Sequence, residues 1–243
     1  MCIVAIGHRV SSRYPLIVAA NRDERYARPA AAADWWAGTG SLLAGRDLEA
    51  GGTWLGVTGS GRFAAVTNVF EGGRGRPAER SRGALVTGFL EGSETPSAYA
   101  AGVGLDRYGP FNLVLGDAAE LFFLSNRNAS KELGFGVHVF SNNAPGLQWT
   151  KVAVLEQAMA GAADGDDPAQ CLIGTLSGPG ASGPPERAAE SMFVVGSEFG
   201  TRCTTVLTVG VDNRAKFVEQ RFDPGGMPAG WSEFEFEISP QAC

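Results

Sequence analysis

Histidine and lysine are rare in this sequence, and their scarcity removes several kinds of active site. Among its 243 residues there are 2 histidines and 4 cysteines, and neither Gly-x-Ser-x-Gly nor His-Glu-x-x-His occurs. No lysine lies in a Gly-x-x-x-x-Gly-Lys-Ser/Thr motif, which excludes a P-loop nucleotide hydrolase. A Ser-His-Asp hydrolase is poorly supported. We expect no catalytic metal, because two imidazoles cannot build a histidine-rich centre.

Excess positive charge and long apolar runs are also missing. The chain carries 20 Lys+Arg against 26 Asp+Glu, a formal net charge of −6. We therefore expect no nucleic-acid partner, since such affinity rests on lysine and arginine, and we interpret the arginine-rich stretch 72–82 as a solvated loop. No apolar run reaches the roughly 18 residues that span a bilayer, and no secretory signal opens the chain. The sequence predicts a cytoplasmic protein without integral membrane association.

The cysteines form neither a zinc motif nor a disulfide framework, because no Cys-x-x-Cys pair is present. Cys171 and Cys203 lie in or beside apolar strings and are expected in the core, whereas Cys243 is terminal. Cys2 differs because it directly follows Met1. Removal of Met1 leaves Cys2 with a free α-amino group (pKa about 7.7–8.0) that can take the proton of a thiol (about 8.5) without a histidine. The alternative is a buried structural cysteine that opens the first strand.

Alternating and β-branched runs predict a protein rich in antiparallel strands. The predicted strands are Cys2–Arg9, Leu16–Ala20, Thr53–Thr58, Arg62–Thr67, Phe111–Gly116, Glu120–Ser125, Val137–Ser141, Thr204–Val209, Lys216–Phe222 and Ser232–Ile238. The predicted helices are Gly83–Leu90, Ser97–Gly102, Trp149–Ala160 and Pro168–Leu176. Strands and helices that do not alternate singly favour an α+β sandwich of antiparallel sheets. No linker divides the chain, so we expect a single domain over residues 1–243.

Polar residues gather where several predicted strands end. Asn21-Arg22-Asp23-Glu24 follows an apolar strand, and we expect a turn there that places these four residues beside Cys2. An arginine lowers the pKa of a nearby thiol, although the four residues could equally be a charged hairpin end. Asn68 and Asn142 also end strands and could donate to an oxyanion, but asparagine is an ordinary turn residue.

Two further residues are candidates for the same region. Arg202 precedes the predicted strand Thr204–Val209 and could complete a polar cluster. Trp54 belongs to a group of aromatic residues in the first third of the chain. Such residues could line a hydrophobic ligand pocket, or they could be plain core or lid residues.

The ordered set of motifs resembles the NRDE family, also called the transport and Golgi organisation family, over nearly the whole chain. The motifs that carry the resemblance are Met1-Cys2, Asn21–Glu24, Ala44–Asp47, Gly51–Gly56, Val66–Asn68, Ser81–Gly83, Phe111–Val114, Phe140–Asn143 and Gly200–Arg202. Through its N-terminal cysteine this family is similar to the N-terminal nucleophile hydrolases of the choloylglycine hydrolase and penicillin acylase branch. The resemblance implies a four-layer αββα sandwich of two antiparallel sheets.

Site roles follow from the same resemblance. It makes Cys2 the nucleophile, Asn142 and, by a looser match, Asn68 the oxyanion donors, and Arg202 an arginine on the late-strand side of the site. That hydrolase branch places its arginine three residues before its aspartate, whereas Arg22 and Asp23 are adjacent here.

Two functions of different classes remain open. The first is a cysteine amidohydrolase that attacks a linear small-molecule amide with Cys2. In this reading Arg22 and Arg202 stabilise the thiolate or a substrate carboxylate, and Asp23 holds the α-amino group of Cys2. The second, implied by the resemblance, is a non-catalytic protein that binds and transfers haem or an acyl-CoA or lipid in the same pocket, with Asn21, Glu24 and Trp54 as ligand-binding residues. No cofactor is required, and haem is a possible ligand, with an axial ligand from His8, His138, a cysteine or a methionine.

Overall fold

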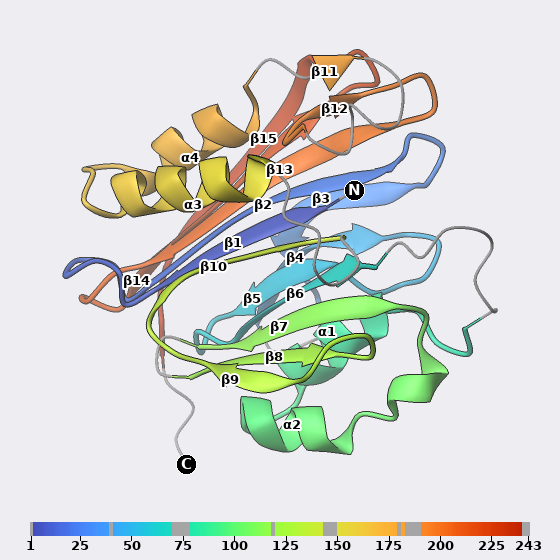
Figure 1. Ribbon diagram of the computed structural model, residues 1–243, viewed down its shortest axis with the longest axis vertical. Coiled ribbons are helices and arrows are strands. Elements are labelled where there is room, and N and C mark those ends of the chain that lie inside the picture. The colour runs from blue at the N-terminus through green and yellow to red at the C-terminus, as the bar shows by residue number, and fades with distance from the viewer. Residues whose placement is uncertain are drawn as a thin grey trace. The chain divides into compact units, whose positions relative to one another are not determined.

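The computed structural model describes residues 2–38, 41–69, 78–117, 120–142, 150–178, 181–182 and 191–239. The contacts within the chain divide it into two compact units (Figure 1). The first unit comprises Met1–Pro29, Phe135–Phe140 and Gln148–Glu237, and the second comprises Ala30–Gly134, Ser141–Leu147 and Ile238–Cys243. Each unit has its own sheet and its own helices.

The first unit is built on an eight-stranded sheet. Its strands are β1 (Ile3–His8), β2 (Leu16–Arg25), β10 (Gly136–Ser141), β11 (Ala181–Ser182), β12 (Val194–Val195), β13 (Phe199–Val209), β14 (Arg214–Phe222) and β15 (Pro228–Glu237). The strand order is β10-β1-β2-β13-β12-β11, with β14 paired to β13 and β15 paired to β14. The short β11–β12 pair is parallel, whereas β1, β2, β13, β14 and β15 pair antiparallel.

Helices α3 (Thr150–Ala163) and α4 (Pro168–Leu176) pack on one face of this sheet (Figure 1). The side chain of Asp167 caps α4 by accepting a hydrogen bond of 3.0 Å from the Gln170 amide, and Pro168 supplies the first helical residue. The buried core beneath the helices contains Ile3, Ala5, Ile17, Ala19, Val206 and Val218 from the sheet, with Leu155, Met159, Leu172 and Leu176 from the helices. The sheet residues alternate along their strands, so the intervening side chains point to the opposite face.

The second unit has a seven-stranded sheet in simple sequence order, β3-β4-β5-β6-β7-β8-β9. The strands are β3 (Ala30–Trp35), β4 (Leu42–Asp47), β5 (Leu55–Thr58), β6 (Phe63–Asn68), β7 (Phe111–Gly116), β8 (Leu121–Ser125) and β9 (Lys131–Leu133). Helices α1 (Gly83–Glu91) and α2 (Pro96–Gly102) and the short 3₁₀ helix η1 (Leu105–Arg107) complete the unit. Its core joins Leu85, Val86 and Phe89 of α1 to apolar residues of β4, β6, β7 and β8.

The predicted α+β class with two antiparallel sheets is confirmed, and two local predictions are wrong. The tetrad does not form a turn, because β2 continues to Arg25 and pairs with β13 along that length. Cys171 is exposed on α4 and is not a core residue. The sequence prediction also missed β3 and β4; most of β3 is exposed, so it lacks a buried alternation that would identify it. Trp149, Asn143 and residues 70–77 lie outside the described residues.

Candidate active site at Cys2

Cys2 lies immediately before β1 and is 8% exposed. Ile3 pairs with Asn21, and the Cys2 thiol contacts the backbone carbonyl of Asp23, with 3.8 Å between Sγ and O. Burial raises the pKa of the Cys2 thiol, and the charge of Asp23 raises it further, whereas the Asp23 hydrogen bond and the charge of Arg22 lower it. The start of β1 and the tetrad in β2 are thus brought together as the sequence predicted.

The first and third tetrad residues, Asn21 and Asp23, are buried in a hydrogen-bond network. Asn21 Nδ2 donates to the carbonyls of Leu176 (2.9 Å) and Met192 (2.7 Å), and its Oδ1 accepts from Thr204 Oγ1 (2.6 Å). A ligand that used the amide of Asn21 would therefore have to displace bonds that hold the chain together.

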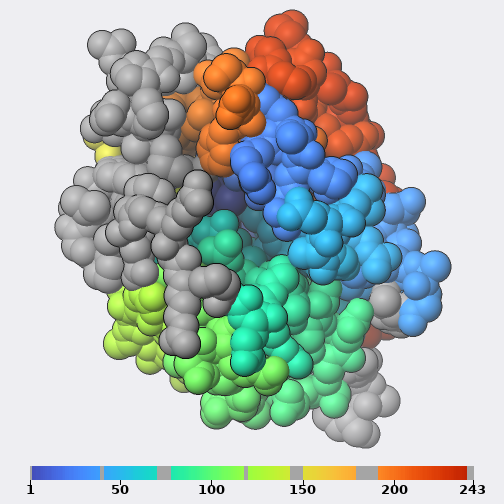
Figure 2. Space-filling view, turned by 90° about the vertical axis from the view of Figure 1, so that its right-hand side faces the viewer, coloured from blue at the N-terminus to red at the C-terminus, as the bar shows by residue number. Residues whose placement is uncertain are grey.

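Asp23 is linked to the same region through a threonine on β13. Thr201 Oγ1 donates to Asp23 Oδ1 at 2.7 Å and accepts from the Val194 amide at 2.9 Å. The network therefore connects β2 and β13 to the segment 191–194, which also accepts from Asn21. Figure 2 shows the end of β2 in blue beside residues of the 191–200 region in orange.

The second and fourth tetrad residues, Arg22 and Glu24, point to the face of the sheet that α3 and α4 leave uncovered, since they alternate with Asn21 and Asp23. Glu24 lies within 3.8–3.9 Å of the guanidinium groups of Arg22, Arg25 and Arg28. Arg22 pairs across the ladder with Cys203, which is buried. Burial raises the pKa of the Cys203 thiol well above its usual range, so Cys203 stays protonated at neutral pH.

Arg202 occupies a bulge in β13, because the register shifts between Thr201 and Cys203. Its Nη1 donates to the backbone carbonyls of Arg25 (3.1 Å), Tyr26 (3.2 Å) and Arg28 (3.2 Å). These bonds fix the chain that leaves β2. Arg202 thus stabilises the end of the tetrad strand, beside the predicted site.

One charged residue of this region was missed by sequence reasoning. Lys151, in the first turn of α3, is 1% exposed. Burial lowers its pKa to about 8, while the charges of Asp23 and Cys2 act in the opposite direction. Its spacing could have revealed it, because Lys151, Leu155 and Met159 recur every four residues and so share the inward face of the helix.

The remaining predicted residues, Asn68, Asn142 and Trp54, belong to the second unit. Asn68 is exposed at the end of β6, and Trp54 is half-buried against the core of that unit. Asn142 is 8% exposed, and its Oδ1 has no hydrogen-bond partner among the described residues. The carbonyl of Ser141 accepts from Thr67 Oγ1 (3.5 Å) and Asn112 Nδ2 (3.3 Å), which holds Asn142 near the end of β6.

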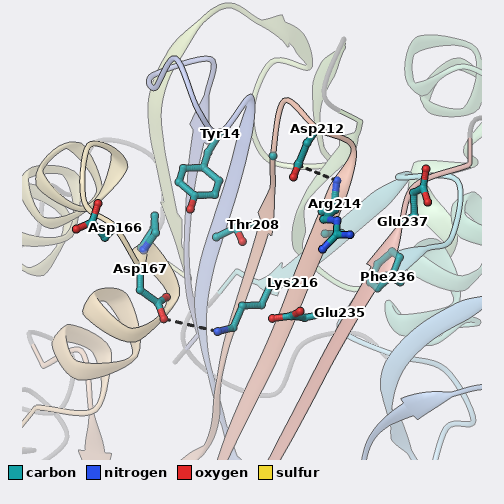
Figure 3. Close-up of a pocket in the computed structure, with 13 residues that line it drawn as sticks. Tyr14, Asp166, Asp167, Thr208, Asp212, Arg214, Lys216, Glu235, Phe236 and Glu237 are labelled. Atoms are coloured by element: carbon teal, nitrogen blue, oxygen red, sulfur yellow. Dashed lines mark hydrogen bonds and ion pairs between the residues drawn. The ribbon is translucent and has the colours of Figure 1, made fainter.

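A groove of about 520 Å³ lies at the other end of the first unit's sheet (Figure 3). It is bordered by Tyr14 of the β1–β2 turn, the α3–α4 connection, and residues of β13, β14 and β15. Lys216 Nζ lies 3.6 Å from Asp167 Oδ2 and 3.0 Å from Glu233 Oε1. Because Lys216 pairs with Thr208 and Thr208 with Ile17, the groove lies at the start of β2, whereas Cys2 lies beside Asp23 in the second half of that strand.

The part of the chain that the structure describes lacks two further features. No cluster of three or more histidine, cysteine, aspartate or glutamate side chains in this part of the chain is arranged to hold a metal ion. None of the helices in it is long and apolar enough to pass through a bilayer.

The fold is that of the N-terminal nucleophile hydrolases. Penicillin V acylase from Agrobacterium tumefaciens superposes with a TM-score of 0.51 and 12% sequence identity, covering 98% of this chain and 86% of that chain. The C2A mutant of the conjugated bile acid hydrolase from Clostridium perfringens superposes with a TM-score of 0.50 and 8% identity, covering 98% and 92%. The chain therefore shares the fold of these hydrolases, and Cys2 lies at the head of its first strand.

Sequence comparison then gives the family. The model of the Transport and Golgi organisation 2 family matches residues 1–224, and the chain belongs to that family. The Transport and Golgi organization protein 2 homolog of Bos taurus is 32% identical over 262 aligned positions, which cover 94% of both chains. The homolog of Homo sapiens is 33% identical over 177 positions, covering 67% of this chain and 64% of that protein.

Proposed function

We propose that the protein is a cysteine amidohydrolase that cleaves a linear amide with Cys2 as its nucleophile. The observation that supports this proposal most is the placement of Cys2: its thiol lies at the head of β1, beside Asp23 and on the same face of the sheet as Arg22, in a hydrolase fold. The proposal includes removal of Met1, which makes the α-amino group of Cys2 the base for its own thiol.

The reaction proceeds in two steps. The Cys2 thiol gives its proton to the α-amino group, the thiolate forms a C–S bond to the amide carbon, and the C–N bond breaks as the amine leaves with that proton. Water then hydrolyses the thioester to a carboxylic acid and regenerates the thiol. The positive charge of Arg22 favours the thiolate, which opposes the effect of burial on the thiol pKa.

We assign the stabilisation of the oxyanion in each step to Asn142 and Asn68, as the family resemblance implies. Removing one oxyanion donor typically costs about 10²–10³ in kcat. The Asn142→Ala variant is expected to lose activity in that range, whereas Asn68→Ala, the looser match, is expected to lose less.

A substrate screen tests the proposal. Protein whose intact mass shows the loss of Met1 is incubated with a panel of N-acyl amides that includes penicillin V and a conjugated bile acid, and the amine product is measured. We expect turnover with at least one amide, loss of at least 10³-fold in Cys2→Ala, and full activity in Cys171→Ser, which removes an exposed cysteine on α4. Retained turnover in Cys2→Ala, or none with any amide, would overturn the proposal.

A second candidate function, binding without turnover, is favoured by one observation. Burial raises the pKa of the Cys2 thiol, and a protonated thiol is a poor nucleophile. The ligands to consider are an acyl-CoA or another lipid, or haem. A haem iron would need His8, His138, a cysteine or a methionine as its axial ligand. The His8 ring packs edge-to-face on Phe135 with 5.2 Å between centroids, so His8 would have to leave this packing.

Titrations distinguish this candidate. Binding of an acyl-CoA is followed by calorimetry, and binding of haem by absorbance, in the wild type and in Arg22→Met. Saturable binding that weakens at least tenfold in Arg22→Met, in protein without amidase activity, supports a carrier. The absence of saturable binding to either ligand would overturn it.

A further inference from the structure

The buried lysine of α3 occupies a position that the helix would ordinarily fill with an apolar residue. Lys151 continues the stripe of Leu155 and Met159, both of which are fully buried in the core between α3 and the sheet. Lysine is almost never fully buried unless it is paired, because desolvation of the ammonium group is costly. The position therefore requires a compensating interaction on the side of the sheet that the helices cover.

That interaction lies in the network beneath the tetrad. Lys151 Nζ donates to the carbonyl of Ser191 at 3.5 Å. The next residue, Met192, accepts from Asn21, and Val194 donates to the threonine that holds the Asp23 carboxylate. The short segment 191–194 therefore brings together the buried lysine and the two buried tetrad residues.

The direction of the tetrad side chains agrees with this arrangement. Asn21 reaches Leu176 in α4, so it points to the helix-covered face of the sheet, and Asp23, two residues later, points to the same face. The charged and titratable groups that act on the Lys151 ammonium are Asp23 from β2 and Cys2 from the start of β1. The segment 191–194 contributes the carbonyl of Ser191. In that setting a carboxylate and an ammonium group compensate each other's burial.

We propose that Lys151 is a positioning residue of the Cys2 site, where its ammonium group balances the buried Asp23 carboxylate and so limits the negative potential that Asp23 imposes on the Cys2 thiol. The inference rests on the proposed role of Cys2 as a nucleophile, but it concerns the ionisation of the thiol and is measurable without a substrate. Lys151 acts through Asp23 and makes no contact with a substrate in this role.

The charge balance gives a sharp test in three variants. Lys151→Met removes the cation and keeps the length of the side chain, Asp23→Asn removes the anion, and the double variant removes both. The rate of Cys2 alkylation by iodoacetamide is measured from pH 6 to pH 10, in a Cys171→Ser/Cys243→Ser background, with peptide mapping to assign the label to Cys2. Intact mass confirms the same N-terminus in every protein, and melting curves confirm that each variant is folded.

We expect Lys151→Met to slow labelling at pH 7.5, where Lys151 still carries its proton, by about three- to tenfold. Asp23→Asn is expected to speed labelling, and the double variant to return to within about twofold of the wild type, because its local charge is again balanced. The matched control is Lys216→Met, which changes the net charge equally but lies in the groove at the far end of the sheet (Figure 3), and which should leave the profile unchanged.

The outcomes separate this inference from the proposed function. A wild-type pH profile in Lys151→Met, or a double variant no closer to the wild type than Lys151→Met, overturns the role of Lys151 even if the protein is an amidase. The expected profiles in a protein that hydrolyses no amide support the role of Lys151 while the amidase proposal fails.

Discussion

Replacement of Lys151 by methionine should change how the stability of the protein depends on pH. Burial lowers the pKa of Lys151 from 10.5 to about 8, which corresponds to about 3 kcal/mol against the charged form. Above pH 8 the folded protein releases this proton, whereas the unfolded chain keeps it until about pH 10.5. The unfolded state therefore binds more protons in that window, and Lys151 makes the wild type more stable as the pH rises through it. Methionine contributes no such increase.

The assay compares melting temperatures of the wild type and Lys151→Met between pH 7 and pH 10.5. Both proteins carry Cys2→Ala, so that this thiol does not titrate in the same range. The melting temperature of the wild type minus that of the variant should increase with pH by about 6–12 °C, since 1 kcal/mol shifts a chain of this size by about 2–4 °C. Two parallel curves would refute the reasoning, because they would show that Lys151 has an ordinary pKa in the folded protein.

Two further predictions concern stability. Asn21→Asp replaces an amide that donates to the carbonyls of Leu176 and Met192 by a carboxylate, and it should lower the free energy of unfolding in urea by about 3 kcal/mol or more. The control Thr204→Val removes one hydrogen bond of the same side chain and should cost about 1 kcal/mol. Equal losses in the two variants would contradict this prediction. Gly52→Ala would place a Cβ 2.8 Å from the backbone carbonyl carbon of Gly83 and should cost about 1–3 kcal/mol. Its neighbour Gly51 has a φ of 78° with open space around it, so Gly51→Asn meets backbone strain but no clash and should cost less than Gly52→Ala. A Gly52→Ala variant as stable as the wild type would contradict this reasoning.

The sequence by itself determined the kinds of the central elements and singled out Cys2. Short-range signals sufficed for α4, where Asp167 and Pro168 mark the first turn, and for the hairpin of β1 and β2. Alternation of apolar residues identified the central strands because one face of each is buried in its own unit. The antiparallel α+β class followed from these elements. Cys2 could be singled out because its position directly after Met1 is read from the sequence and does not depend on how the chain folds.

Only the tertiary structure decided the roles of the polar residues. Asn21–Glu24 looked like a turn, but the pairing of β2 with β13 and the carbonyls of Leu176 and Met192 keep these residues in a strand. Arg202 binds carbonyls of a segment that is remote in sequence, and Lys151 becomes a buried charge only when α3 packs on the sheet. Polar side chains take their roles from partners far along the chain, whereas the periodicity of apolar residues is local, and therefore the sequence alone predicts the elements better than it predicts the site.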